Sequence, residues 1–152
     1  MNPSAPGHYR SKTLATWIAV LGGSLGLHRF YLYGLRDPLG WLHPVPTLLG
    51  LHGLQRVQQL GQDDRLSWML IPLLGLMVAQ AMLAAILYGL TPDEQWAERF
   101  NPGRPVQPTR WGPVLGAIAA LMLGAGTLMA TIAFSGQRFF EWQIEEARKI
   151  SQ

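Results

Sequence analysis

The sequence predicts an all-α polytopic membrane protein with about four transmembrane helices arranged as two hairpins. Charged residues make up only 14% of the 152 residues, compared with roughly 25% in an average soluble domain, whereas hydrophobic residues make up 49%. Several apolar stretches, each about as long as a helix that crosses a bilayer, follow one another along the chain. Aromatic residues stand near the ends of these stretches, as they do at membrane interfaces.

The composition also excludes several classes of function. The chain has no cysteine, which excludes disulfides, thiolate metal sites and cysteine nucleophiles. Its net charge is only +3, and no run of lysine or arginine provides the basic surface that nucleic-acid binding requires. A modest basic excess suits the cytoplasmic surface of a membrane. We therefore expect a lipid bilayer as the partner of this chain, and no nucleic acid.

The first predicted hairpin is irregular in its second half. Residues 13–32 form an apolar segment as long as the ~20 residues that cross a hydrocarbon core, and no small-residue cleavage site follows, so we interpret it as a retained span. Residues 39–60 are interrupted by Pro44 and Pro46. Because proline lacks a backbone donor and clashes with the preceding turn, we expect this second element to be kinked or broken.

The second predicted hairpin has two clean spans. Residues 67–90 and residues 111–136 contain no charged side chain. Trp68 and Tyr88 lie twenty residues apart. That separation is about 30 Å along a helix, which places each ring at one membrane interface.

Two further helical segments are predicted outside the spans. Trp96 and Phe100 are four residues apart and share one face of a short helix, which we expect to lie on the membrane surface. The last residues continue the fourth helix as a cytoplasmic tail that begins with aromatic side chains. The predicted organisation is a disordered N-terminus (1–9), a two-transmembrane hairpin (10–60), a second hairpin with the short helix in its loop (61–136) and the helical tail (137–152).

The distribution of basic residues predicts the orientation. An even number of spans puts both termini on one side, and the excess of lysine and arginine on that side favours the cytoplasm for both termini. The basic residues on the side of the termini are Arg10, Lys12, Arg56, Arg65, Arg138, Arg148 and Lys149, and those on the other side are Arg29, Arg36, Arg99, Arg104 and Arg110.

The stretch RSKTLATWIAVLGGSLGLHRFYLYG resembles the two-transmembrane (TM-two) domain family, of the bacterial NINE-protein type, over about residues 9–60. The family pattern is a basic Ser/Lys start, an apolar helix, a Gly-rich turn and a His- or Asp-Arg-Phe-Tyr-Leu-Gly motif. Tyr33 is inserted here before the last glycine, and many members have an acid at the position of His28. The resemblance implies an integral protein of the bacterial inner membrane with no enzyme activity, from a family whose biochemical role is unsettled. The residues that carry it are Gly22, Gly26, His28, Arg29, Phe30, Tyr31, Gly34 and Asp37.

Arg29 is the sharpest candidate for a functional residue. A charge in the middle of a bilayer costs from roughly 2.5 kcal/mol upwards, so the side chain must reach the interface, pair with an acid or line water. The favoured interpretation is an interface anchor that binds lipid phosphate, with Phe30 and Tyr31 as aromatic neighbours. The alternatives are a clamp to Asp37 that fixes the turn of the hairpin and, third, a ligand or ion site.

The remaining polar residues give little support for catalysis or metal binding. His43 and His52 are nine residues apart, which puts them on opposite faces of a straight helix, and zinc needs three or four ligands. Asp64 is interpreted as the N-cap of the third helix, not as half of a carboxylate pair. The serines lack a base in any recognisable arrangement. We therefore expect no enzyme activity, no cofactor and no metal.

Small residues predict close helix packing. Gly22 and Gly26 form a Gly-x-x-x-Gly pair in the first span, and small residues recur at four-residue intervals in the fourth. We expect the fourth-span ridge to pack within the chain; its members are Gly112, Gly116, Ala120 and Gly124. The function predicted from these features is a non-enzymatic protein that packs against itself or another membrane protein. The alternative is a small transporter or channel subunit that uses the proline-broken second element.

Overall fold

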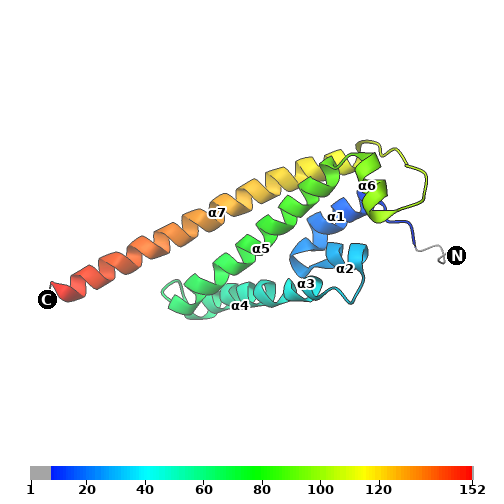
Figure 1. Ribbon diagram of the computed structural model, residues 1–152. Coiled ribbons are helices and arrows are strands. Elements are labelled where there is room, and N and C mark those ends of the chain that lie inside the picture. The colour runs from blue at the N-terminus through cyan, green and yellow to red at the C-terminus, as the bar shows by residue number, and fades with distance from the viewer. Residues whose placement is uncertain (1–7, 152) are drawn as a thin grey trace.

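The computed structural model describes residues 8–151, which fold into helices joined by short turns without any strand. The predicted all-α class is therefore confirmed. The predicted disordered segment, residues 1–9, lies almost wholly outside the described residues. In chain order the elements are α1 (Lys12–Gly22), the 3-10 turn η1 (Gly23–Leu25), α2 (Leu27–Tyr33), α3 (Pro38–Leu42), α4 (Pro44–Leu60), α5 (Arg65–Leu90), α6 (Asp93–Phe100) and α7 (Trp111–Ile150) (Figure 1).

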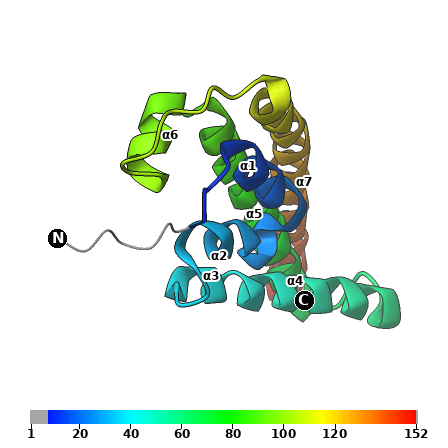
Figure 2. The same ribbon diagram turned by 90° about the vertical axis from the view of Figure 1, so that its right-hand side faces the viewer.

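The long helices α5 and α7 form the frame of the molecule. They run antiparallel and side by side, joined by a connector that contains α6 (Figures 1 and 2). Both are long and apolar enough to cross a membrane by length and composition, and no other helix within residues 8–151 meets that measure. The structure thus supplies two candidate spans in place of the four predicted.

The predicted first span, residues 13–32, is wrong as a continuous helix. The chain turns at Gly26, whose φ of +77° lies in the left-handed region that glycine adopts without strain. A Cβ atom there would also collide with the carbonyl oxygen of Gly40. After the turn, α2 brings the chain back to the start of α1, where the backbone N–H of Ser11 donates to the Tyr31 hydroxyl at 2.8 Å. The segment is therefore a helical hairpin that returns to the end where it began.

The second element is interrupted by prolines as predicted. It is divided at His43 into α3 and α4, and α4 begins with Pro44. The first backbone N–H groups of a helix have no acceptor within that helix, so a proline at this position removes no helical hydrogen bond. From there α4 runs back alongside the first half of α5 (Figure 1). The two helices approach closely at Gly53, where a Cβ atom would lie 2.7 Å from Cβ of Leu70.

Helix α6 has the predicted apolar face, but this face packs on protein. Trp96 is only 2% exposed, and Phe100 is also buried. They form one core cluster with Ala15 of α1 and Leu32 of α2. The aromatic side chains expected to lie on the membrane are thus covered by the returning α1–α2 hairpin instead.

The small-residue ridge of α7 packs within the chain, as expected. A Cβ atom at Gly112 or Gly116 would lie 2.7 Å from the methyl group of Thr13 or Thr16, respectively, on α1. Ala120 is fully buried among the alanines of α1 and α5, and Gly124 meets Met82 of α5. The Gly22 and Gly26 pair is different, because these glycines flank the η1 turn and form no ridge along one helix.

The start of α1 lies at the same end of the molecule as the connector between α5 and α7, which we call the connector end. Lys12 contacts the backbone of Thr91 and the carboxylate of Asp93 there. Helix α7 runs from this end to Ile150 at the opposite end, beyond the start of α5 (Figure 1). The expectation that both termini share one side, facing away from the connector, is therefore not supported.

Candidate functional site

Arg29 forms a two-pronged ion pair with Asp37 across the turn between α2 and α3. Its Nε donates to one carboxylate oxygen at 2.6 Å, and its Nη2 donates to the other at 3.3 Å. Asp37 is also the N-cap of α3 and accepts from the backbone N–H of Gly40 at 3.0 Å. The hydrogen bond from Arg29 holds the pKa of Asp37 below its usual value. The contact that the structure shows is thus the clamp, and not the lipid anchor favoured from the sequence.

The neighbouring motif residues fix the same turn. Phe30 lies against the ring of Trp41, with centroids 5.1 Å apart, and a Cβ atom at Gly40 would clash with the Phe30 ring. Gly34 ends α2 with a φ of +87°. Together with the Ser11–Tyr31 hydrogen bond, these contacts account for the aromatic motif as the framework of a folded hairpin.

His28 and His43 meet in the interior where the two irregular elements bend. His28 is 1% exposed, and its ring lies edge-on to that of His43 with centroids 5.6 Å apart. Nδ1 of His43 is 2.6 Å from the carbonyl oxygen of Leu39, so Nδ1 carries the proton and Nε2 is an acceptor. Among the described residues, neither Nε2 of His43 nor Nδ1 of His28 has a hydrogen-bond partner. Buried polar atoms of this kind are uncommon, because most buried polar groups in folded proteins are hydrogen-bonded.

A cavity of about 290 Å³ opens between α2, α5 and α6, beside His28 and Arg29. Arg99 of α6 donates to the Tyr33 hydroxyl at 3.3 Å and lies over the Phe100 ring. Arg29 lies over the Tyr33 ring, 5.1 Å from its centroid. Further side chains of α5 and α6 complete the walls, namely Gln80, Tyr88, Trp96 and Phe100. The cavity therefore combines two guanidinium groups with aromatic walls.

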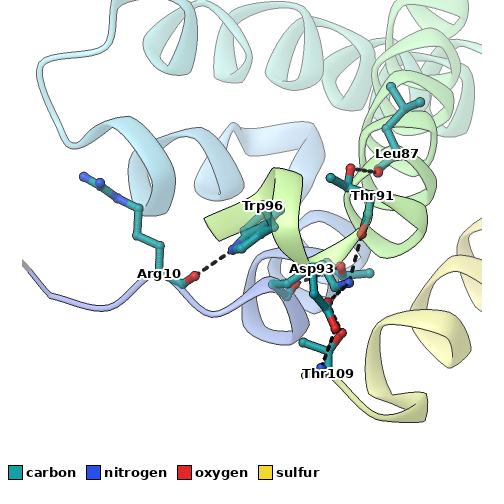
Figure 3. A network of polar contacts seen from close by, with 8 residues as sticks. Arg10, Leu87, Thr91, Asp93, Trp96 and Thr109 are labelled. Atoms are coloured by element: carbon teal, nitrogen blue, oxygen red, sulfur yellow. Dashed lines mark hydrogen bonds and ion pairs between the residues drawn. The ribbon is translucent and has the colours of Figure 1, made fainter. Parts of the chain in front are cut away.

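A polar network fastens α6 over this cavity (Figure 3). Lys12, only 5% exposed, donates to the carbonyl oxygen of Thr91 at 2.9 Å and pairs with Asp93. Asp93 also accepts from the backbone N–H of Thr109 at 2.8 Å. The Trp96 indole donates to the carbonyl oxygen of Arg10 at 2.8 Å. The network joins the start of α1 to both ends of the connector.

Sequence reasoning misses most of these residues. In the sequence, Lys12 is interpreted as a basic residue that flanks a span, and neither Asp93 nor Arg99 belongs to a recognisable motif. The one available signal is the unusual density of charged and aromatic residues in the connector. The prediction for Asp64 is confirmed, because its carboxylate caps α5 by accepting from the Ser67 N–H at 3.1 Å. Asp64 also accepts from Arg56 at 2.8 Å.

No metal centre emerges from the described residues, which contain no group of three or more histidine, aspartate or glutamate side chains placed to hold an ion. His52, the partner considered for His43, is exposed on α4. No protein-family model, curated protein or solved structure matches this chain.

Proposed function

We propose that this chain is a non-enzymatic integral membrane protein of the bacterial inner membrane that acts by binding a second copy of itself or another membrane protein. The resemblance to the two-transmembrane domain family points the same way. This proposal is supported by the exposure of the two candidate spans, α5 and α7. In the most apolar stretch of each helix, only 17% of the residues are buried within the protein. The other faces carry large apolar side chains that suit lipid or neighbouring helices.

The observation that carries the interaction proposal is an exposed apolar face on the last part of α7, which lies beside the start of α5. Phe140 and Ile144 are four residues apart, lie on one face of the helix and are 63% and 55% exposed. Glu141 and Glu145, each one residue further along the helix, give this face a charged border on one side. An exposed apolar helical face with a polar rim is typical of a surface that binds another helix.

Mild-detergent purification with light scattering and site-specific photocrosslinking tests this proposal. We expect a discrete complex and a crosslinked protein adduct from a photoreactive residue at Phe140. The Phe140→Ser/Ile144→Ser variant should dissociate the complex, whereas Gln143→Ser on the neighbouring exposed surface should not. A monomer that crosslinks only to lipid or detergent at Phe140 would reject the interaction.

The transporter or channel alternative has one observation in its favour. Gln80 of α5 borders both the cavity beside His28 and a second cavity of about 180 Å³ beside His43. Polar groups at the bends of broken helices are typical of substrate sites in transporters. Proton flux into dye-loaded proteoliposomes that is abolished by His43→Ala would support this function. Proteoliposomes that show no proton flux would reject it.

The topology that we propose has the N-terminal segment and the connector on one side of the membrane and the end of α7 on the other. This arrangement follows from the returning α1–α2 hairpin, which leaves α5 and α7 as the helices that run between the two ends, with α4 alongside the first half of α5.

A further inference from the structure

We propose that the cavity between α2, α5 and α6 is a binding site for a phosphoryl group, with Arg99 as its principal ligand. This site is separate from the apolar face of α7 and does not depend on a protein partner. The shared chemistry is a phosphate monoester or diester, which either a membrane lipid or a soluble phosphorylated compound carries.

The charges around the cavity favour an anion. No carboxylate lines it. The charge of Arg29 is neutralised by Asp37, whereas Arg99 has no ion-pair partner among residues 8–151. One uncompensated guanidinium, that of the exposed Arg99, therefore borders the cavity, and the planar fork of this group matches phosphate oxygens.

Hydrogen-bonding groups beside Arg99 are available to the same ligand. Within the described chain, the Tyr88 hydroxyl and the Gln80 amide line the cavity without a protein hydrogen bond. Arg99 itself is oriented by its bond to the Tyr33 hydroxyl, which leaves its other N–H groups free to donate. Donors on α5 and α6 therefore border the same cavity.

The size and position of the cavity limit the ligand. Its volume of about 290 Å³ is at the lower end of the ~300–1,000 Å³ typical of ligand sites, which suits a headgroup and not a large cofactor. The aromatic rings of Trp96 and Phe100, 4.4 Å apart, provide an apolar wall for the carbon skeleton next to the phosphate. Tyr88 and Thr91 border the cavity at the end of a candidate span, which is the depth where lipid phosphates lie.

Thermal unfolding in detergent micelles distinguishes the two sources of phosphate. Full-length protein in dodecyl maltoside, which contains no phosphate, is compared with protein in the same detergent supplemented with phosphatidylglycerol, and inorganic phosphate is titrated into the first sample. A shift with phosphatidylglycerol alone identifies a lipid headgroup, and a shift with inorganic phosphate identifies a soluble ligand. A shift with neither rejects the proposal.

The variants test whether Arg99 provides the binding. Arg99→Gln should weaken the binding of whichever ligand shifts the wild-type protein, phosphatidylglycerol or inorganic phosphate, about tenfold. This is the loss expected for a charge-assisted hydrogen bond. Tyr88→Phe should weaken it less. Arg36→Gln is the matched control, because Arg36 is an exposed arginine in the turn after α2 that does not line the cavity. If Arg99→Gln and Arg36→Gln both fold and weaken phosphate binding equally, binding depends on the general surface charge and the proposed site is rejected.

Discussion

Arg29 and Asp37 close the turn between α2 and α3 through a two-pronged ion pair, and the same carboxylate starts α3 as its N-cap. One acid therefore joins the end of the returning hairpin to the beginning of the next helix. The aromatic residues next to Arg29 pack around this turn, as Phe30 does on Trp41. The motif is thus explained by the geometry of a chain reversal.

The first prediction concerns this pair. Arg29→Lys and Asp37→Asn should lower the melting temperature in detergent by similar amounts of a few degrees, because lysine cannot reproduce the planar fork of arginine. Arg36→Lys serves as the control. If Arg29→Lys melts at the same temperature as the wild type, a positive charge at this position is sufficient for stability, and the lipid-anchor interpretation is favoured.

The second prediction concerns pH. The hydrogen bonds from Arg29 to Asp37 and from Arg56 to Asp64 lower the pKa of each carboxyl below its ordinary value. Each group therefore contributes stability that is fully present above about pH 4 and is lost as the pH falls through its lowered folded-state pKa. Unfolding midpoints measured from pH 7 down to pH 3 should fall at the acidic end, and Asp37→Asn or Asp64→Asn should flatten that decline.

The third prediction concerns the ridge of α7. Gly116→Leu should destabilise the protein by about 1–3 kcal/mol, because the added side chain has to displace α1. Gly126→Leu is the matched control on the same helix, since a Cβ atom there meets nothing within 4 Å. Equal thermal stability of the two leucine variants would contradict the packing of this ridge against α1.

The fourth prediction concerns Lys12. Lys12→Met should cost about 1–3 kcal/mol, because it leaves the carbonyl oxygen of Thr91 and the carboxylate of Asp93 without their buried donor. Lys149→Met removes the same side chain from an exposed pair with Glu146 and should change the unfolding free energy little. Proteolysis of the connector should also accelerate in Lys12→Met alone. An unchanged connector would show that Lys12 does not hold α6.

The sequence is most informative where the physics is local. Helices α5 and α7 are predictable because each contains a charge-free stretch as long as a membrane span, residues 67–90 and 111–136, and the division at His43 follows from Pro44 and Pro46. The turn at Gly26 is not predictable in the same way. Apolar content in residues 13–32 is equally compatible with a helix that crosses and with one that turns back, and only the close approach of Gly40 decides between them.

The candidate site illustrates the same limit. Arg29 and Asp37 are eight residues apart, so their pairing is a local alternative that the sequence already suggests. Lys12 and Asp93 are 81 residues apart, and Arg99 reaches Tyr33 across 66. Those contacts exist because the α1–α2 hairpin returns to the connector end. This return is a feature of the tertiary structure, and no short sequence motif predicts it.

The last prediction follows from that return. Because α1 and α2 form a hairpin that ends where it starts, the N-terminal segment and the connector should face the same compartment, opposite the end of α7. Single cysteines replacing His8, Gln107 and Ser151, all exposed, are treated in intact cells with a membrane-impermeant thiol reagent. Positions 8 and 107 should give the same result and position 151 the opposite one.

The pattern of labelling separates the returning hairpin from a first span. A continuous helix over residues 13–32 would place position 8 opposite position 107 and on the side of position 151, which is the arrangement expected from the basic residues. Permeabilised cells, in which all three cysteines should react, control for access. Matching labels at 8 and 151 with a different label at 107 would mean that the α1–α2 hairpin opens in the membrane, and that the contact between Lys12 and Asp93 is absent there.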